Sequence, residues 1–360
     1  MRRTVLTLCV FICLVSLKIS GQTAPSTPLP RVELRSATTV VLPGEVDSNS
    51  PAVWDRVQGQ RRIFVMTSVG GRPSIASGQG LTRLGKAAPI AMTPWPNGGV
   101  WMEAVVPDVD GTWYGYYHLE RGATVCRDTS RVIPSIGAAR SRDFGATWES
   151  LGTVLAAPAF SHDCVTNDRY NVGGLGDFTV QLDSSSRDLF IFFSQYVRSG
   201  RLQGVGVARL AWADRDQPAR RVMVWQDSRW MTAAARFGPE RFIASAIPIF
   251  PAAEPWHDTN TIVDAFWGPS VHWNTHLQQY VMLLNRSKDT NWTQDGIYVS
   301  FARKLDDPRL WSKPVKIING GQWYPQVVGI DEGAGTDRLA GEMARLFVRG
   351  TSTRLIRFIK

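Results

Sequence analysis

The sequence predicts an all-β protein, a five-bladed β-propeller of four-stranded antiparallel blades with loop insertions between the blades. Three observations lead to this fold class: a two-strand pattern that recurs, a further strand after each copy, and 360 residues without a shift in composition. The clearest copy is residues 173–196, where the alternating run 178–182 and the apolar run 189–193 flank a polar turn. Alternation bounded by turn residues is typical of half-buried strands, and two such runs form a hairpin.

Four other segments repeat this hairpin pattern. The second copy carries Asp110-Gly111, a strong turn signal, between its two strands. Each copy is followed by another strand and usually by another hairpin, so the unit is a sheet of four short antiparallel strands with a period of roughly 50–90 residues. Such sheets, repeated around an axis, are the blades of a propeller. The five copies span residues 50–68, 103–118, 173–196, 268–286 and 324–350.

Residues 1–21 have the features of a secretory signal peptide. Arg2 and Arg3 give a positive start, and the apolar stretch 5–17 is too short to span a bilayer. We therefore expect an exported protein, periplasmic or extracellular, in which residues 22–30 form a flexible leader rich in Pro, Ser and Thr. Residues 31–360 are predicted to form a single propeller domain. In it the alternating stretch 31–42 pairs with the last blade and closes the ring.

The charge of the chain does not indicate a nucleic-acid partner. The formal net charge is +9, and removal of Arg2, Arg3 and Lys18 with the signal peptide leaves +6. The basic residues are scattered, without a Lys/Arg run or a nucleic-acid motif, which is typical of a solvated basic surface. We expect a monomer that has no nucleic-acid partner and, in the mature form, no membrane contact.

Four cysteines are present, and the signal peptide removes two of them. The remaining pair, Cys126 and Cys164, is expected to form a disulfide, because two cysteines in an exported protein usually pair. The alternative is metal ligation, with His162 and Asp163 beside Cys164. The two thiols lack the CxxC spacing of common zinc sites, which favours the disulfide.

Residues 141–148 read SRDFGATW and match the SxDxGxTW pattern known as the Asp-box, found in sialidases and other propellers. Asp143 and Gly145 are expected to shape a hairpin turn, with Trp148 packed beneath it. The resemblance implies a structural role, away from the mouth of an active site.

Taken together, the five hairpins resemble the five-bladed propeller glycoside hydrolases, especially the glycoside hydrolase family 43 group. The resemblance covers roughly residues 47–360 as a pattern rather than as identity. In that family the innermost strand of several blades begins with a short motif whose carboxylate points into the central pocket. The resemblance therefore implies a carbohydrate-active enzyme with an oligo- or polysaccharide substrate.

The match departs from the family at several strand starts. In the first blade Ser50 stands where the family has Asp before Pro, with Asp47 three residues earlier. In the third blade Asp177 stands where the family has the Asp that tunes the acid. In the fourth blade Trp267 takes the place of the family's acid, and Asp264 lies three residues before it.

Four carboxylates lie at or just before predicted inner-strand starts: Asp47, Glu103, Asp177 and Asp264. Because the blades converge on an axis, these acids are predicted to line one mouth. Carboxylates crowded into a partly dry funnel push their pKa values apart, which leaves one as acid and another as base or nucleophile. Glycosidic cleavage needs such a pair. The alternative for each residue is that it caps a turn.

Aromatic and histidine side chains beside the same strand starts are predicted to bind sugar. Indole rings stack on sugar faces, although packing between blades is the alternative. Trp267 and Trp323 are predicted as pocket walls, and His257 is predicted to lie over the mouth as an acid or hydrogen-bond donor. The predicted substrate-binding residues are Trp267, Trp323, His257, Asp258, Trp54 and Trp101.

No cofactor is predicted. No HExxH or similar metal spacing occurs, and a structural calcium ion in the central channel is compatible with the sequence but not required by it. His118 ends a second strand, so we expect it to lie deeper in the blade or on the far face.

Three functions fit these observations. The first is an exported glycoside hydrolase that uses the axial carboxylates. The second is a non-catalytic carbohydrate- or ligand-binding propeller, which the missing acid at Trp267 favours. The third is a sialidase-like hydrolase, although only one Asp-box is found and the arginine motif of sialidases is not seen near the start.

Overall fold

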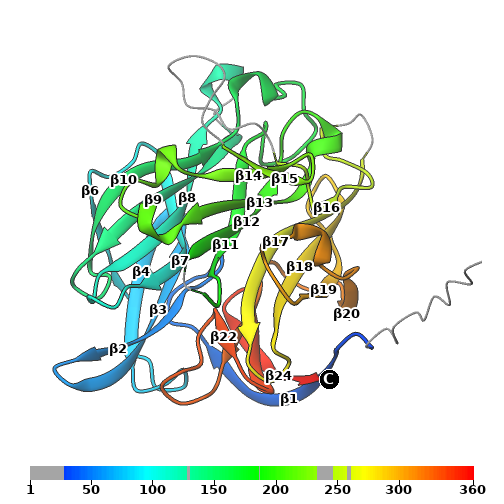
Figure 1. Cartoon of the computed structure of the whole chain (residues 1–360). Helices are drawn as coiled ribbons and strands as arrows, with labels where there is room; N and C mark the ends of the chain where they lie inside the picture. Colours follow the sequence, from blue (N-terminus) through cyan, green and yellow to red (C-terminus); the bar gives the residue numbers. More distant parts are fainter. Residues whose placement is uncertain (1–27, 128–129, 186, 233–245, 258–260) are drawn as a thin grey trace, which may run out of the picture.

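The computed structural model describes residues 28–127, 130–185, 187–232, 246–257 and 261–360 and has five sheets arranged in a ring (Figure 1). Every strand of the described part belongs to one of these sheets. The predicted signal peptide, residues 22–27 of the predicted leader, and Asp258 lie outside the described residues. The five-bladed propeller predicted from the repeats is therefore confirmed.

The sheets follow one another along the chain, and each contains a hairpin that the sequence predicts. Blade 1 consists of β2 (Ala52–Val57), β3 (Gln60–Val69), β4 (Arg72–Gly78) and β5 (Ala88–Pro89). Blade 2 consists of β7 (Gly99–Pro107), β8 (Trp113–Gly122), β9 (Val132–Ser141) and β10 (Thr147–Ala156), with β6 (Ala91–Thr93) parallel to β10.

Blades 3 and 4 have additional short strands at their edges. Blade 3 consists of β11 (Leu175–Leu182), β12 (Asp188–Gln195), β13 (Gly204–Ala211), β14 (Met223–Gln226), β15 (Arg229–Thr232) and β16 (Phe250–Pro251). Blade 4 consists of β17 (Ile262–Asn274), β18 (Gln279–Asp289), β19 (Gln294–Ala302), β20 (Val315–Asn319) and β22 (Leu339–Ala340). Six short 3-10 helices lie in the described connections: η1 (Thr124–Cys126), η2 (Ala159–Ser161), η3 (Gly200–Leu202), η4 (Trp212–Asp214), η5 (Pro218–Arg220) and η6 (Pro308–Leu310).

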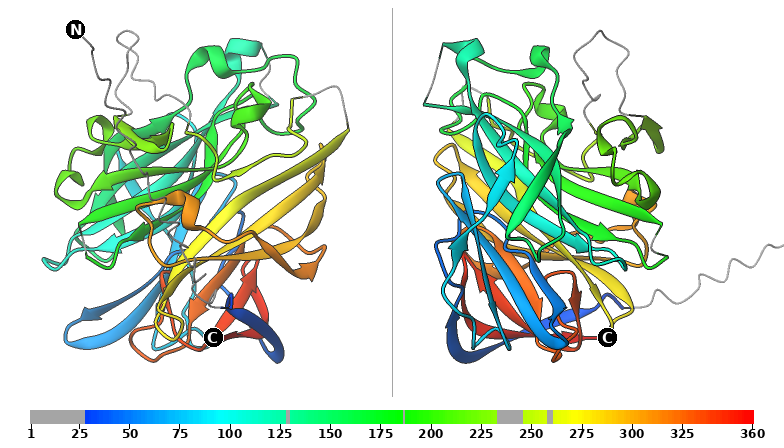
Figure 2. Two further views of the ribbon diagram at one scale, coloured as in Figure 1. Left: turned by 45° about the vertical axis from the view of Figure 1, so that its right-hand side comes forward. Right: turned by 90° about the vertical axis from the view of Figure 1, so that its left-hand side faces the viewer.

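Blade 5 closes the ring by joining the two ends of the described chain. It consists of β21 (Pro325–Gly329), β23 (Met343–Val348), β24 (Thr351–Ile359) and β1 (Arg31–Val41). β1 pairs antiparallel with β24, and Figure 2 shows the blue strand alongside the red ones. The predicted pairing of residues 31–42 with the last blade is therefore confirmed.

The apolar core is divided among the interfaces between neighbouring blades. Leu189, Ile191 and Phe193 of β12 pack with residues of blade 2, such as Tyr116. The alternate residues Phe190 and Phe192 pack with blade 4 instead. Because both faces of β12 are covered, its sequence is a continuous apolar run rather than an alternating one. Large buried rings therefore fix the angular spacing of the blades.

The inner strands of three blades carry an irregularity at comparable positions. The ladder of β7 shifts register between Met102 and Ala104, and that of β11 shifts between Gly176 and Phe178. In β17 the shift falls between Trp267 and Ser270. A bulge redirects the side chain at its centre. The bulges in β7 and β11 contain the predicted acids Glu103 and Asp177.

Residues 141–148 form the turn between the outer strands β9 and β10. The Asp143 carboxylate accepts hydrogen bonds from the Thr147 backbone N–H at 2.9 Å and from its hydroxyl at 2.6 Å. The buried Trp148 ring donates from Nε1 to the Gly145 carbonyl at 2.8 Å. All the side-chain oxygens of Asp143 thus act within the turn.

A search of the described helices finds none with the length and apolar character needed to cross a membrane.

Candidate functional site

Two of the predicted acids meet at one histidine near the axis. Glu103 Oε1 lies 3.2 Å from His118 Nδ1, and Asp177 Oδ1 lies 3.9 Å from the same nitrogen. The residues come from three strands, β7, β8 and β11, which Figure 1 shows in the centre of the molecule. His118 was predicted to lie deeper or on the far face; it is buried, as the first alternative expects, and it lies beside the predicted acids. The bulge in β7 brings Glu103 to the face that the β8 histidine also uses.

The backbone of β11 is shaped to hold Asp177 against this histidine. Asp177 has φ 42°, which the bulge imposes, and its carbonyl accepts a hydrogen bond from Ser194 Oγ at 3.2 Å. Gly176 gives the strand room for the imidazole, because a Cβ there would be 2.6 Å from His118 Cε1. The Phe178 backbone N–H then donates to Glu103 Oε2 at 2.8 Å. The bulge thus ties the two predicted acids together.

Two further carboxylates surround His118. Glu120 is two residues along β8 and therefore on the same face, with Oε1 3.8 Å from His118 Nε2. Asp47 precedes the first blade and interacts electrostatically with His118 and Asp177. Glu103 is fully enclosed, whereas the Asp177 and Glu120 side chains are 10% and 29% exposed. A ligand from solvent would therefore meet Asp177, Glu120 and Asp47, with Glu103 behind them.

The Glu103–His118 pair holds a proton at neutral pH. Burial raises the pKa of Glu103 to about 7, although its contacts with His118 and with the Phe178 N–H act in the opposite direction. Burial alone would lower the pKa of His118. The hydrogen bond with Glu103 and the charges of Asp177 and Glu120 outweigh that effect and raise the pKa to about 9. His118 is thus an imidazolium surrounded by carboxylates.

The outer acids also have perturbed pKa values. Burial, reinforced by the charge of Asp177, raises the pKa of Asp47, while Arg349 and His118 lower it in part. Burial raises the pKa of Glu120 as well, against the lowering effect of His118. Crowded carboxylates therefore retain protons to higher pH than isolated ones would.

Two buried tyrosines complete the cluster. The Tyr196 hydroxyl donates a hydrogen bond to Asp177 Oδ2. Burial and the charge of Asp177 raise the pKa of Tyr196 well above its ordinary value, so this hydroxyl keeps its proton. Burial and the charges of the same acids also raise the pKa of Tyr324. Neither tyrosine was predicted from the sequence.

Asp264 does not join the other predicted acids. It is the third residue of β17 (Ile262–Asn274), and its backbone bridges to Glu254. Its carboxylate forms a bidentate pair with Arg286, with Nη2–Oδ2 at 2.6 Å. Both carboxylate oxygens are thus engaged by one guanidinium group. Asp264 therefore does not belong to the group of acids around His118.

Trp267 is a core residue rather than a pocket wall. It is 1% exposed, its Nε1 donates to Gln294 Oε1 at 3.1 Å, and it packs against Trp292. The prediction that Trp267 forms a wall of the pocket is therefore wrong. Trp323 is half-buried, with its ring edge-to-face with Tyr170 at 5.8 Å, and Tyr170 is 37% exposed. These two rings present an aromatic surface to solvent.

The remaining predicted aromatic residues occupy different places. Trp101 lies beside the acid cluster, with its ring centre 5.8 Å from that of His118. Trp54 does not lie at the axial cluster. It belongs to β2 and packs against the loop after β21, where its Nε1 donates to the Gly335 carbonyl at 2.8 Å. Only Trp101 of these two therefore adjoins the predicted site.

His257 supports the site from the loop before blade 4. Its Nδ1 contacts Thr166 Oγ1 and its Nε2 contacts the carbonyl of Tyr196. Tyr196 in turn holds Asp177, so His257 is linked to the acids through one residue. The predicted partner Asp258 lies outside the described residues.

Asn49, which was not singled out from the sequence, joins the first blade to two others beside Ser50. Its Nδ2 donates to the carbonyls of Phe178 at 2.8 Å and Pro269 at 3.0 Å, which belong to blades 3 and 4. Ser50 instead exchanges backbone hydrogen bonds with the Gln326 amide. The Asn49 amide thus connects the start of blade 1 to blades 3 and 4.

The axial cluster could also hold a metal ion. Glu103, His118 and Asp177 each offer a ligand atom, and these atoms lie within 4.8 Å of one another. One imidazole and two carboxylates suit a transition metal such as zinc better than calcium, which prefers six or more oxygen ligands. The sequence spacing did not indicate this set because the three donors come from three different strands.

The predicted disulfide is confirmed. Cys126 and Cys164 are bonded, with Cα atoms 5.1 Å apart, and metal ligation by these thiols is thereby ruled out. The bridge fixes the loop before β11 to η1. That loop carries Asp168, whose Oδ1 accepts a hydrogen bond from Trp292 Nε1 at 3.1 Å. It also carries Tyr170, so the bridge anchors the loop that supplies part of the exposed aromatic surface.

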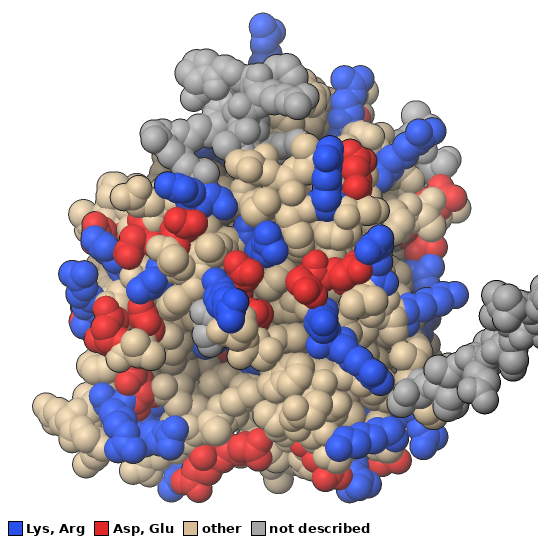
Figure 3. All heavy atoms as spheres, in the orientation of Figure 1, with Lys and Arg blue, Asp and Glu red and all other residues tan. Residues whose placement is uncertain are grey.

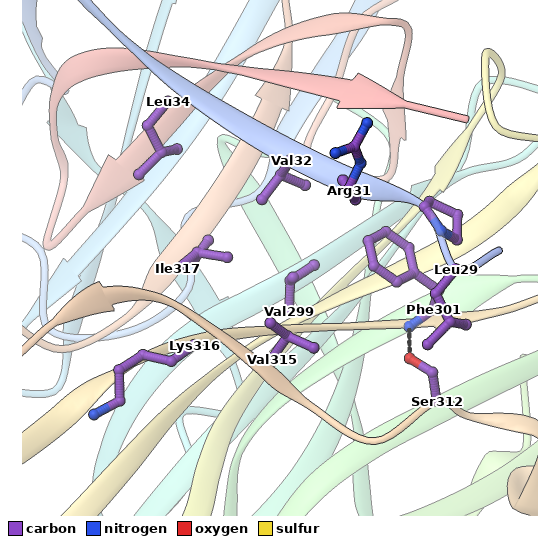
Figure 4. Close-up of a pocket in the computed structure, with 11 residues that line it drawn as sticks. Leu29, Arg31, Val32, Leu34, Val299, Phe301, Ser312, Val315, Lys316 and Ile317 are labelled. Carbon is purple, nitrogen blue, oxygen red and sulfur yellow. Dashed lines mark hydrogen bonds between the residues drawn. The ribbon is translucent and has the colours of Figure 1, made fainter.

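A cavity of about 540 Å³ lies away from this chemistry, between the start of β1 and strands β19 and β20 (Figure 4). Its walls are mostly aliphatic, with Val32, Leu34, Val299 and Ile317 pointing into it, and it holds none of the predicted site residues. This aliphatic cavity is therefore separate from the acid cluster around His118.

Comparisons with known proteins give similarity in structure only. No family model and no curated protein matches the sequence. The endo-arabinase from Bacteroides thetaiotaomicron is 10% identical, with 89% of this chain and 97% of that chain covered and a TM-score of 0.48. An exo-1,5-alpha-L-arabinanase from a bovine ruminal metagenomic library is 13% identical, with 87% and 94% covered and a TM-score of 0.46. The activity of this chain therefore has to be inferred from its own site.

Proposed function

We propose that the protein is an exported glycoside hydrolase that cleaves an oligo- or polysaccharide at the axial acids Asp47 and Asp177. The observation that carries the proposal is the convergence of four carboxyl groups on the single imidazole of His118. Two carboxyl groups of unequal proton affinity, on either side of a bound sugar, are what glycosidic cleavage requires.

Asp47 is proposed as the general acid. Burial and the charge of Asp177 raise its pKa, so it keeps a proton closer to neutral pH than an exposed aspartate does. It would donate this proton to the oxygen of the leaving sugar. The positive charge of Arg349 limits this rise in the pKa of Asp47.

Asp177 is proposed as the base or nucleophile. It reaches solvent and accepts the Tyr196 hydroxyl hydrogen bond, which fixes the carboxylate plane. Glu103 has a different role, because its side chain is fully enclosed and cannot touch a sugar without rearrangement. It holds His118 as a cation 3.9 Å from Asp177 and so positions that carboxylate.

The aromatic surface and the acids together favour a neutral sugar. Trp323 and Tyr170 offer ring faces on which sugar rings can pack. The concentration of carboxyl groups around His118 would repel a uronate at the cleavage point. We further propose that residues 31–360 act as one domain and that the mature protein is monomeric and periplasmic or extracellular.

The test is hydrolysis of aryl glycosides and plant polysaccharides by the mature chain and by Asp177→Asn. We expect the variant to lose about 10²–10⁴-fold in kcat/KM, as is typical for loss of an acid–base group. Asp227→Asn is the matched control, because Asp227 is an exposed turn residue with φ 50°, which Asn tolerates. Equal rates for Asp177→Asn and Asp227→Asn would refute the assignment.

A non-catalytic glycan-binding propeller is the second candidate. It is favoured by blade 4, where the buried Trp267 stands at the inner strand and Asp264 is paired with Arg286. This candidate predicts binding of oligosaccharides by the wild type and no hydrolysis of any substrate in the panel. The two candidates are therefore separated by product formation alone.

A further inference from the structure

A second groove lies between blade 1 and the loop that follows β21, apart from the axial acids. It consists of two adjoining cavities, of about 490 and 260 Å³. The four residues that line both cavities are Trp54, Gln79, Arg83 and Glu332. Figure 3 shows basic side chains gathered beside the β2–β3 hairpin, at the lower left of the molecule. Nothing in the proposed hydrolysis uses this surface.

The larger cavity is mostly basic, with three arginines and one carboxylate, Glu332, on its walls. Arg61, Arg62 and Arg83 line the larger cavity, and the Arg62 guanidinium is held by Ser77 Oγ at 3.2 Å. Arg61 is packed on the neighbouring loop, because a Cβ at Gly333 would lie 2.9 Å from its guanidinium carbon. Within the described residues, neither Arg61 nor Arg83 forms an ion pair with a carboxylate. Two guanidinium groups on the wall of the larger cavity therefore remain available to an anionic ligand.

The middle of the groove contains an indole ring of fixed orientation. Trp54 is half-buried, and its Nε1 is bonded to the Gly335 carbonyl, so the ring cannot rotate freely. The side-chain amides of Gln60 and Gln79 lie on the same walls. An aromatic face flanked by amides is a surface on which a sugar ring packs and forms hydrogen bonds.

The smaller cavity has mixed charge. Asp331 and Glu332, from the loop after β21, line it together with Arg83 and Arg345. Carboxylates accept hydrogen bonds from hydroxyl groups but repel a continuous chain of phosphates. The larger cavity, with three arginines, therefore suits the anionic group of a ligand, and the smaller cavity of mixed charge suits its hydroxyl groups.

We propose that this groove binds a saccharide that carries an anionic group, either a carboxylate or a sulfate. The anionic group lies against Arg61 and Arg83, where planar guanidinium groups form paired hydrogen bonds with oxyanions. A sugar ring packs on Trp54, and its hydroxyl groups reach Glu332. The groove acts as a binding site and does not depend on hydrolysis at the axial acids.

The test is calorimetric titration of the mature chain with three probes: trigalacturonate, its neutral methyl ester, and neocarratetraose sulfate. We expect an anionic probe to bind, and added salt to weaken binding. Binding of trigalacturonate would indicate that the groove recognises a carboxylate. Binding of neocarratetraose sulfate would indicate that it recognises a sulfate. The ester should bind at least about tenfold more weakly than the acid, because it lacks the charged acceptors.

Variants assign the binding to the groove. Arg61→Gln combined with Arg83→Gln should weaken binding of the anionic probe by about tenfold or more. Trp54→Phe keeps an aromatic ring and should weaken binding of the anionic probe less than the double arginine variant does. The charge-matched control is Arg303→Gln with Lys304→Gln, two exposed residues on blade 4.

Three results would overturn the proposal: equal binding of acid and ester, equal loss in the groove and control pairs, or no binding of either anionic probe at millimolar concentration. Asp177→Asn should bind the probe as the wild type does, so failure of the proposed hydrolysis would not affect this outcome.

Discussion

Gly176→Ala places a methyl group where β11 crosses the imidazole of His118. The added Cβ would be 2.6 Å from both Cε1 and Nε2 of that ring and 3.0 Å from Pro134 Cβ. These contacts are about 1 Å shorter than the optimum for carbon atoms. The ring cannot retreat, because Nδ1 is bonded to Glu103, which the Phe178 N–H holds in turn. Either β11 or the histidine must therefore move.

We expect this substitution to lower the free energy of unfolding by about 1–3 kcal/mol, as overpacking of a rigid interior does. Urea unfolding measures the change. Gly122→Ala is the matched control, because Gly122 is the exposed last residue of β8, the strand that carries His118, and its added Cβ meets no atom within 4 Å. If the two variants unfold at the same urea concentration, the tight packing of β11 on His118 is refuted.

Three further predictions concern the same cluster and its support. The pKa of His118 is raised from 6.5 to about 9, so the protonated imidazole stabilises the folded state fully below pH 6.5, and this stabilisation is lost as the pH rises through 9. In chelator-containing buffer, the free energy of unfolding should therefore fall by about 3 kcal/mol between pH 6.5 and pH 9. The same measurement on His118→Gln should show a much smaller fall. Replacing Cys126 and Cys164 together with Ser should lower stability by about 3–4 kcal/mol in urea unfolding, because the bridge closes a loop with a sequence separation of 38. Tyr196→Phe removes the hydroxyl that orients Asp177 and should lower kcat of the proposed hydrolysis more than it changes KM, with unchanged values as the contrary result.

The fold was largely predictable because each blade repeats one local pattern. The runs 178–182 and 189–193 correspond to β11 and β12, and the alternating stretch 31–42 to β1. These patterns reflect burial, which acts residue by residue and is visible in the sequence. The disulfide was predictable for a different reason, since only two cysteines lie outside the predicted signal peptide.

The site was only partly predictable because it depends on register. Glu103 and Asp177 were found as strand-start acids, but the contact with His118 arises from bulges whose position the alternation does not reveal. Glu120 lies two residues from His118 on the same strand face, a signal that the sequence contained. The pairing of Asp264 with Arg286 was not predicted, because it joins the neighbouring strands β17 and β18, whose register the sequence does not show.

The most direct test of the proposed roles compares Asp47→Asn and Asp177→Asn on substrates with good and poor leaving groups. A dinitrophenyl glycoside departs without protonation, whereas an unactivated oligosaccharide requires a general acid. The proposed roles predict that Asp47→Asn loses little activity on the dinitrophenyl glycoside and most of its activity on the unactivated oligosaccharide. Asp177→Asn should lose activity on both substrates. Wild-type rates for both variants on the unactivated oligosaccharide would contradict these roles.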